Sequence, residues 1–323
     1  MRHAETVTFG GSALNRAAEL RGPKAQVALR AQSNAKTILL WRGKPLLCDQ
    51  LDGGLGLVWV GIDHPVLGPE CGSLVFLGLD DAAAPLFLAN ISNWEPEELP
   101  DTLNTFLDPS VQFHPSLING EYFAELRVVM TRLSPRDAEL AAMARGILEW
   151  HRTHSFCVSC GGNTYIAMAG WQQNCTVCNR SHFPRTDPVV IMLITHGNNV
   201  LMGRSHAWPE GMYSLLAGFV EPGETLEAAV RREVFEESGI RVGSVNYLAS
   251  QPWPFPASLM FGCVGDALNE DITIDPEEIE DALWVSREDM VDVFEGVHPK
   301  IKPARKGAIA HFLLENWLSD SLK

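Results

Sequence analysis

The sequence predicts an α+β protein of about two domains. Short apolar runs between turn residues are interspersed with helical segments, without the regular strand–helix–strand order of a parallel α/β sheet. The chain has 323 residues, which is enough for about two domains that each bury a core. Apolar residues make up 46% of it and charged residues 20%, the usage of globular rather than disordered proteins.

The charge balance is acidic. There are 25 Lys and Arg residues against 40 Asp and Glu residues, so the formal net charge is −15. This charge weakens long-range attraction to nucleic acids and anionic membranes, whereas a small anionic ligand can still be held by a local cation or metal. Because no apolar stretch approaches the roughly 18 residues of a membrane helix and no secretory signal is apparent, we expect a cytoplasmic protein without a membrane partner.

Residues 1–152 are expected to form the first domain. Apolar runs predict strands at 36–41, 55–62 and 73–79, and the Asp-Gly-Gly turn at 52–54 predicts a hairpin. Ser134 and Pro135 are typical of the N-cap and first turn of a helix, which is expected to run to about His151. The acidic and histidine residues of this domain are scattered, so no catalytic cluster is expected in it.

Residues 153–185 contain two closely spaced cysteine pairs. They are Cys157-x2-Cys160 and Cys175-x2-Cys178. Two such pairs suit one tetrahedral Zn²⁺, and four thiolates leave no open position for water, so a structural ion is favoured over a redox or catalytic role. The remaining cysteines lie in apolar or glycine-rich surroundings and are expected to be unreactive core thiols: Cys48, Cys71 and Cys263.

Residues 186–323 are expected to form the third region. Strands are predicted at 188–195, 200–203, 213–216 and 283–285, and a C-terminal helix at 309–318. A further helix is expected between Thr225, a typical N-cap, and Gly239, a typical left-handed residue after a helix end.

Three glutamates on this further helix indicate a metal site. At 100° per residue, Glu233 and Glu237 fall within about 20° of Leu226, on the apolar stripe that should face the core, and Glu236 borders that stripe. Carboxylates spaced i, i+4 repel one another, and more strongly once buried. Clustered oxygen ligands suit Mg²⁺ or Mn²⁺. A solvated acidic face is the alternative, but it does not explain why the same face is apolar.

The segment around these glutamates resembles the Nudix box, Gly-x5-Glu-x7-Arg-Glu-apolar-x-Glu-Glu-x-Gly-apolar. Every specified position is filled, by Gly218, Glu224, Arg232, Glu233, Val234, Glu236, Glu237, Gly239 and Ile240. The resemblance implies an αβα sandwich that hydrolyses nucleoside diphosphates linked to another group. It also implies that the three glutamates and the carbonyl of Ala217 bind divalent metals. Arg232 and Glu224 would pair to fix the junction between the loop and the helix. Gly218 would be a further structural residue of the box.

A proline-rich string, Ser-Gln-Pro-Trp-Pro-Phe-Pro-Ala-Ser, follows at residues 250–258. Its prolines favour an extended backbone that presents Trp253 and Phe255 for stacking on a flat ring. The Gln251 amide and the Ser258 hydroxyl could orient polar groups. The residues alone equally allow a rigid edge loop or a proline-rich ligand for a partner domain.

This string, a preceding four-cysteine ribbon and a domain before that resemble the NADH pyrophosphatase subfamily of Nudix hydrolases. In residues 1–152 the resemblance depends on order and length alone, and it implies a Nudix-like α/β domain there. The substrate contacts that it implies are Phe183, Gln251, Pro252, Trp253, Pro254, Phe255, Pro256, Ala257, Ser258 and Ala310. It implies Glu278 as a further metal carboxylate, with Glu277 as the alternative. The chain departs from relatives at Phe183, commonly Tyr, and at Gly170, a substrate-binding Glu in some.

The resemblance implies hydrolysis of NADH or NAD⁺ to nicotinamide mononucleotide and AMP, with roughly two or three Mg²⁺ or Mn²⁺ ions. The catalytic groups would be Glu233, Glu236, Glu237 and Glu278, and the residues do not choose the general base. Two alternatives remain: the same chemistry on NAD-capped RNA, with a basic lip formed by Arg180, Arg185 and Arg204, or a sensor that binds dinucleotides without cleaving them. A homodimer is usual in the subfamily.

Overall fold

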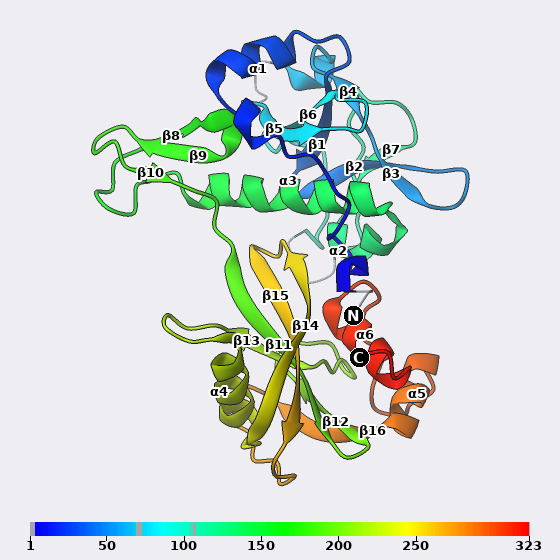
Figure 1. Cartoon of the computed structure of the whole chain (residues 1–323). Helices are drawn as coiled ribbons and strands as arrows, with labels where there is room; N and C mark the ends of the chain where they lie inside the picture. The colour runs from blue at the N-terminus through cyan, green and yellow to red at the C-terminus, as the bar shows by residue number, and fades with distance from the viewer. Residues whose placement is uncertain (1–3, 69–72, 104, 106–107, 323) are drawn as a thin grey trace. The chain divides into compact units, whose positions relative to one another are not determined.

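The computed structural model describes residues 4–68, 73–103, 105 and 108–322, which form two compact units (Figure 1). The N-terminal unit comprises Gly11–Arg185 and Pro254–Ala257. The C-terminal unit comprises Met1–Gly10, Thr186–Trp253 and Ser258–Lys323. Each unit has its own sheet and core, and the predicted domain boundaries after residues 152 and 185 stay predictions. No helix in the described parts of the chain is both long enough and apolar enough to cross a bilayer.

The N-terminal unit is built on a mixed sheet. Its strands are β1 (Lys36–Trp41), β2 (Lys44–Asp49), β3 (Leu55–Leu57), β4 (Val60–Gly61), β5 (Val75–Leu79), β6 (Pro85–Asn90) and β7 (Glu121–Phe123). The order is β3-β2-β1-β6-β5, with β4 paired to β1 and β7 paired to β2. Strands β1 and β6 are parallel and the other pairs are antiparallel. The hairpin predicted at residues 52–54 is confirmed, since it joins β2 to β3.

Helices α1 (Pro23–Arg30), α2 (Leu126–Val129) and α3 (Pro135–Thr153) complete this unit. The predicted N-cap of α3 is confirmed, because the Ser134 hydroxyl accepts a 3.1 Å hydrogen bond from the Asp137 N–H. Its apolar stripe is buried through Leu140, Ile147 and Trp150. Helix α1 was not expected from the sequence, although Pro23 at its first turn was an available signal.

The cysteine-rich region forms a small antiparallel sheet of β8 (Thr164–Ala167), β9 (Gln172–Cys175) and β10 (Ser181–His182), in the order β10-β9-β8. The turn between β8 and β9 packs against β5, where the Trp171 Nε1–H donates a 2.7 Å hydrogen bond to the Phe76 carbonyl. Gly170 lies in this turn with φ 101°, and a Cβ there would lie 2.6 Å from Val75 Cγ1. The glycine at 170 is therefore required by packing within the unit.

The C-terminal unit contains a second mixed sheet. Its strands are β11 (Asp187–His196), β12 (Asn199–Arg204), β13 (Leu216–Phe219), β14 (Val242–Trp253), β15 (Ser258–Ala267) and β16 (Asp281–Ser286). The order is β14-β15-β11-β12-β16, with β13 paired to β11. Strands β11 and β15 are parallel. The predicted strands 188–195, 200–203 and 283–285 are thereby confirmed within slightly longer elements.

Helices cover both faces of this sheet, α4 (Leu226–Ser238) on one and α5 (Arg287–Glu295) and α6 (Ile309–Leu318) on the other (Figure 1). Alternate residues of β11 serve the two faces. Met192 packs in the same core as Val230 of α4, whereas Leu193 packs in the core that contains Leu313 of α6. The predicted αβα sandwich is confirmed.

One predicted strand is wrong in position. Residues 213–216 were expected to form it, but β13 begins at Leu216 and continues through Gly218, because residues 216–219 pair with 189–192 of β11. The partner strand thus overrides the turn tendency of glycine. The long strands β14 and β15 were not expected. Pro252 is tolerated in β14 because this strand lies at the edge of the sheet.

Candidate active site

Helix α4 is held in place by its two ends. The Thr225 hydroxyl accepts a 3.3 Å hydrogen bond from the Ala228 N–H, and Gly239 ends the helix with φ 69°. Both signals agree with the sequence analysis. Between these two ends, Glu237 is buried, Glu233 is partly buried and Glu236 is exposed.

Glu237 is buried without a countercharge. Its side chain is in a residue only 9% exposed, and its Oε2 atom has no hydrogen-bond partner among the described residues. Burial, and after it the nearby charges of Glu233, Glu278 and Glu236, together raise the pKa of Glu237 to about 8. The fold therefore keeps a partnerless carboxylate against other acids, an arrangement that a bound cation would stabilise.

Gly218 makes room for the carboxylate of Glu233. A Cβ at position 218 would lie 1.9 Å from Cδ of Glu233, so no other residue fits without displacing that side chain. Burial raises the pKa of Glu233, although the Arg232 guanidinium, 2.8 Å from its Oε1, opposes the increase. The carboxylate of Glu233 thus lies beside Gly218 of β13, the residue that follows Ala217.

Arg232 links the box loop to the helix. Its Nε and Nη2 atoms donate to the two carboxylate oxygens of Glu224 at 2.7 and 2.9 Å, and Nη2 also donates to the Phe219 carbonyl at 3.0 Å. The hydrogen bonds from Arg232, with one from the Glu221 N–H, lower the pKa of Glu224 to about 2. Nη1 reaches Glu236 at 2.9 Å. The pairing implied by the resemblance is present in the structure, and it holds Glu236 on the solvent side.

Glu278 lies in a turn next to the C-terminal half of α4. The backbone N–H of Asp275 donates to the Glu237 carbonyl at 3.3 Å, and the buried side chain of Ile279 anchors the far end of the turn. Glu278 contributes to the raised pKa of both Glu233 and Glu237, and Glu277 does not. Of the two candidates left open by the sequence, Glu278 is therefore the one whose charge lies close to the box glutamates.

Arg204 supports this turn, a role that sequence reasoning missed. Its guanidinium pairs with Glu280 at 2.9 Å and donates to the backbone carbonyls of Trp208 and Met212 at 2.8 and 3.3 Å. His206 Nε2 lies 2.9 Å from the Pro276 carbonyl and adds a second tie. The expectation that Arg204 contributes to a basic lip is therefore not supported, because its donors are used inside the unit.

Gln251 uses its amide to hold the backbone around Ala310. The residue is 1% exposed, its Nε2 donates to the carbonyls of Thr8 and Gly307 at 3.0 and 2.8 Å, and its Oε1 accepts from the Ile309 N–H at 2.8 Å. Since Ala308 gives no side-chain cap to α6, Gln251 satisfies one of the free N–H groups of that helix start. The Gln251 amide thus holds the backbone of Gly307 and Ile309, next to Ala310 in sequence.

The other residues of the proline-rich string divide between the two units. Pro252 and Trp253 end β14 and Ser258 begins β15, in the C-terminal unit, whereas residues 254–257, including Pro256 and Ala257, belong to the N-terminal unit. There the Phe255 ring has the guanidinium carbons of Arg127 and Arg145 at 4.2 and 4.8 Å from its centroid. Arg145 also donates to the Pro254 carbonyl at 3.0 Å.

The three aromatic rings expected to bind the substrate have different surroundings. The Trp253 ring centroid lies 6.4 Å from that of Phe9. Phe183 follows β10 in the N-terminal unit and is 66% exposed. The faces of Phe255 are engaged by arginines, which was not expected from the sequence. A direct role of these rings in substrate binding stays a prediction.

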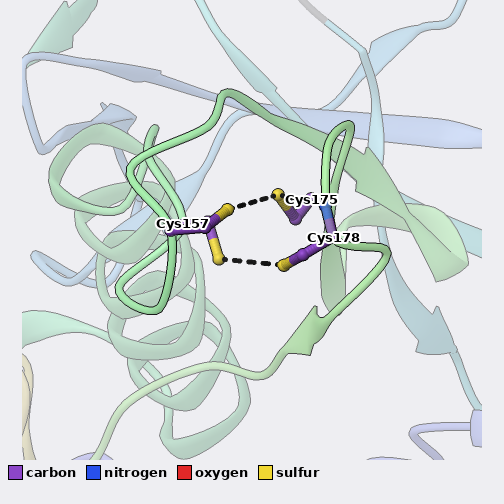
Figure 2. A group of neighbouring side chains, drawn as sticks. Cys157, Cys175 and Cys178 are labelled. Atoms are coloured by element: carbon purple, nitrogen blue, oxygen red, sulfur yellow. Dashed lines mark hydrogen bonds between the residues drawn. The ribbon is translucent and has the colours of Figure 1, made fainter.

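The two cysteine pairs converge on one point. The Sγ atoms of Cys157, Cys160, Cys175 and Cys178 all lie within 4.8 Å of one another. Cys157 and Cys178 are 3.7 Å apart and Cys160 and Cys175 are 3.4 Å apart (Figure 2). Four thiolates at about 2.3 Å from a tetrahedral Zn²⁺ would be about 3.8 Å from one another, so the set fits that ion. No other group in the described residues converges as tightly.

Hydrogen bonds favour the thiolate form of Cys175. The N–H groups of Val177 and Cys178 donate to Cys175 Sγ at 3.3 and 3.4 Å and lower the pKa of Cys175. His182 Nε2 lies 3.2 Å from Cys157 Sγ. Of the other cysteines, Cys263 is buried, and burial raises its pKa to about 11. Cys48 is half-buried, and Cys71 lies outside the described residues.

Comparisons with known proteins agree with this architecture. Residues 184–312 match the NUDIX domain, and residues 34–150 match the NADH pyrophosphatase-like rudimentary NUDIX domain. The second match confirms the Nudix-like N-terminal domain that the sequence implied by order and length.

Curated relatives are similar over more than half of the chain. Human "NAD-capped RNA hydrolase NUDT12" is 39% identical over 269 residues, 77% of this chain and 58% of that protein, so the chain spans little more than half of its length. "NAD-capped RNA hydrolase NudC" from Stutzerimonas stutzeri is 38% identical over 64% of this chain and 72% of that protein. Human "NAD(P)H pyrophosphatase NUDT13, mitochondrial" is 36% identical over 69% of each. The chain therefore belongs to the Nudix hydrolases, in the group that carries an NADH pyrophosphatase-like domain ahead of the Nudix domain.

Proposed function

We propose that this protein hydrolyses the pyrophosphate bond of NADH or NAD⁺ and releases nicotinamide mononucleotide and AMP. The observation that carries the proposal is the partnerless buried carboxylate of Glu237, beside Glu233 and Glu278, on the helix of a complete Nudix box. A relative named for NAD(P)H pyrophosphatase activity, similar over 69% of each chain, supports the choice of dinucleotide.

The acidic residues of this site fit divalent cations. The proposed ligands are the carboxylates of Glu233, Glu236, Glu237 and Glu278 with the carbonyl of Ala217, an all-oxygen set suited to Mg²⁺ or Mn²⁺. The orphaned Oε2 of Glu237 is the structural observation that supports this fit. When bound, such ions neutralise phosphate oxygens and lower the pKa of the attacking water.

The residues of the chain then have distinct tasks. Arg232 and Glu224 fix the loop against the helix, and Gly218 admits the carboxylate of Glu233. One carboxylate, from the box or from Glu278, accepts the proton of the attacking water, which requires it to be ionised and within hydrogen-bond reach. The residues of the string 250–258, with Phe183 and the backbone of Ala310, are proposed to hold the dinucleotide.

The cysteine cluster has a structural task in this proposal. Cys157, Cys160, Cys175 and Cys178 would hold one Zn²⁺ per chain, without an open position for water. We further propose that the chain divides into 1–152, 153–185 and 186–323, and that it acts as a cytoplasmic homodimer.

A second candidate substrate is NAD-capped RNA, released as 5′-monophosphate RNA by the same chemistry. Two of the relatives carry this activity in their names. Arg180 and Arg185 remain from the expected basic lip, although Arg180 donates to the Ser159 hydroxyl at 2.7 Å. A sensor without hydrolysis is disfavoured, because binding alone needs no complete set of metal carboxylates.

Product analysis tests the proposal. The protein is incubated with NADH, NAD⁺, ADP-ribose or NAD-capped RNA, with Mg²⁺ or Mn²⁺ and with a chelator, and the products are separated by chromatography. From NADH and NAD⁺ we expect AMP and nicotinamide mononucleotide, and we expect their formation to stop when the chelator removes the metal. Cleavage of capped RNA at a much higher kcat/KM would favour the second candidate, and binding of NADH without cleavage of any substrate would favour the sensor.

A further inference from the structure

The first described residues of the chain belong to the C-terminal unit, whereas the residues that follow them in sequence belong to the N-terminal unit. Residues up to Gly10 group with this unit, and the short 3-10 helix Ala4–Thr6 contacts β14. Both matched family regions begin later, at residues 34 and 184. We call residues 4–10 the N-terminal segment. Its contacts therefore lie outside what the family models describe.

Consecutive residues of this segment contact the substrate string or its support. Val7 is buried in the core that contains Ile309 and Leu313 of α6. The carbonyl of Thr8 accepts the 3.0 Å hydrogen bond from Gln251 Nε2. The next residue, Phe9, places its ring against that of Trp253.

Phe9 occupies a backbone conformation that disfavours large residues. The Gly10 N–H donates to the Val7 carbonyl at 3.2 Å and closes a turn, and Phe9 is its third residue, with φ 73°. Glycine is preferred at such a position, because a side chain there strains the backbone. The ring is nevertheless retained and is only 1% exposed. The contacts of the ring must therefore offset the strain.

The Phe9 ring is also well placed to orient Trp253. The two centroids are 6.4 Å apart with planes inclined at 58°, within the range of favourable tilted aromatic pairs. Trp253 is the last residue of β14, two residues after Gln251. The N-terminal segment therefore contacts both the Trp253 ring and the Gln251 amide at the end of this strand.

We propose that the N-terminal segment is a positioning element of the substrate site, with Phe9 as its principal residue. Phe9 sets the orientation of the Trp253 ring for stacking on a flat ring of the dinucleotide, and Thr8 fixes Gln251 and thereby the start of α6. The inference rests on the proposed function, because the role of Trp253 in binding belongs to that proposal. Phe9 contacts no reacting atom, so its effect falls on binding rather than on the chemical step.

The test compares two substitutions of Phe9 in the full chain. Phe9→Leu removes the aromatic face, and Phe9→Gly removes the ring while relieving the backbone. Because an aromatic pair contributes modestly, we expect KM for NADH to rise about 3- to 10-fold in both variants, with kcat within about 2-fold of wild type. Phe294→Leu is the matched control, since it removes a ring that stacks on His311 at 4.9 Å in the same unit.

The outcomes separate this inference from the proposed function. Equal KM values for wild type, Phe9→Leu and Phe9→Gly would overturn the inference and leave the proposed hydrolysis intact. A fall in kcat with unchanged KM would also overturn it. If Phe9→Gly unfolds below the assay temperature, the dissociation constant of NADH is measured for Phe9→Leu and wild type by NADH fluorescence. A rise of about 3- to 10-fold in Phe9→Leu would support the inference, and equal values would overturn it. A wild-type protein that neither binds nor cleaves NADH would contradict both proposals.

Discussion

Glu237 lowers the stability of the metal-free fold at the same position where it is proposed to bind a metal ion. Its Oε2 atom is buried without a hydrogen-bond partner among the described residues, and three other carboxylates raise its pKa in addition to burial. An ionised group in that position costs free energy of folding unless it is paired. The metal-free protein should therefore carry an instability at Glu237 that metal binding removes.

Replacing this carboxylate by an amide tests that cost. In a chelator at pH 9, above the pKa of about 8, we expect Glu237→Gln to unfold at a higher temperature than wild type. Each kcal/mol corresponds to about 2–4 °C for a domain of this size. Differential scanning calorimetry measures the difference, with Glu210→Gln at an exposed position as the control. A lower melting temperature for Glu237→Gln would show that the carboxylate has a stabilising partner.

Gly218→Ala tests the packing of Glu233. The added methyl group would lie 1.9 Å from Cδ of Glu233, so it must displace the carboxylate. Because small displacements of catalytic groups cost about 100-fold in rate, we expect a loss of about that size in kcat for NADH. Gly146→Ala is the control, as a Cβ there meets nothing within 4 Å. Near-normal kcat for Gly218→Ala would contradict the assignment of Glu233 as a metal ligand.

At the level of single residues, helix periodicity allowed the sequence to predict which glutamates lie on the buried face of α4. It placed Glu233 and Glu237 on the apolar side of their helix and Glu236 at its border, and the burial of Glu237 agrees. It could not predict that the Gln251 amide is used by the Thr8 carbonyl, because that contact joins residues 243 positions apart. Tertiary contacts of this range leave no periodic signal in a single sequence.

The cysteine region is an element whose order depends on few apolar contacts. Its strands β8, β9 and β10 are short, and the sulfur cluster is the feature that ties both pairs together. In a segment of this kind, metal binding supplies much of the free energy of folding.

Cys175→Ser should therefore remove the ion and loosen the region. We expect one zinc per chain in the wild type and less than one in the variant, measured by inductively coupled plasma mass spectrometry. Limited proteolysis should then cut the variant within residues 155–182, and wild type only after strong chelation. Cys263→Ser is the control, because that thiol lies outside the cluster. Full zinc occupancy in Cys175→Ser would rule out the four-thiolate site.

A buried ion pair ties strand β2 of the N-terminal sheet to the loop between β6 and β7. Lys44 Nζ, at the start of β2, lies 2.7 Å from Asp108 Oδ2, and it also donates to Gln112 at 3.0 Å. Burial alone would raise the pKa of Asp108, but hydrogen bonds from Lys44, Ser110 and Thr102 outweigh it and hold the pKa well below its usual range.

The pH dependence follows from that lowered pKa. The ionised Asp108 stabilises the fold fully above its unfolded pKa of about 4, and this contribution is lost as pH falls toward the lower folded value. We expect Asp108→Asn to lower the free energy of unfolding by about 3–5 kcal/mol at pH 7 and by less at pH 3. Urea titrations measure both values, with exposed Asp101→Asn as the control. A difference that grows toward pH 3 would contradict the pairing.

Among the elements, those with strong end signals were predictable. Helix α3 begins after Ser134, α4 lies between Thr225 and Gly239, and both agree with the structure. Strand β13 was misplaced because its partner β11, not its own residues, decides where it pairs. Strand β14 was not predicted, since prolines at its end concealed an edge strand.

On the scale of the whole molecule, the net charge of −15 weakens long-range attraction to RNA and so bears on the choice between the two candidate substrates. A dinucleotide bound through metal ions and a few side chains should show little dependence on salt, whereas an RNA footprint releases counterions in proportion to its phosphate contacts. We expect kcat/KM for NADH to change less than about 2-fold between 50 and 200 mM salt. A steep loss for NAD-capped RNA over the same range, measured in parallel, would indicate a real RNA footprint.

The arrangement of the chain was only partly predictable. The order of Nudix-like domain, cysteine ribbon and Nudix domain was implied by the resemblance to the NADH pyrophosphatase subfamily, which for residues 1–152 depended on order and length alone, and the matched family regions agree with it. The assignment of the first ten residues to the C-terminal unit was not foreseen. Val7 and Phe9 are ordinary apolar residues in sequence, and only the folded chain shows that both are buried and that Val7 enters the core beside α6.

The most direct test of the account is the turnover of NADH by Glu237→Gln. The variant and the exposed control Glu210→Gln are assayed with saturating Mg²⁺ or Mn²⁺, and AMP is quantified. We predict that Glu237→Gln loses at least about 100-fold in kcat while the control stays within about 2-fold of wild type. A Glu237→Gln variant that releases AMP at the wild-type rate would contradict the central claim that this buried carboxylate belongs to the catalytic metal site.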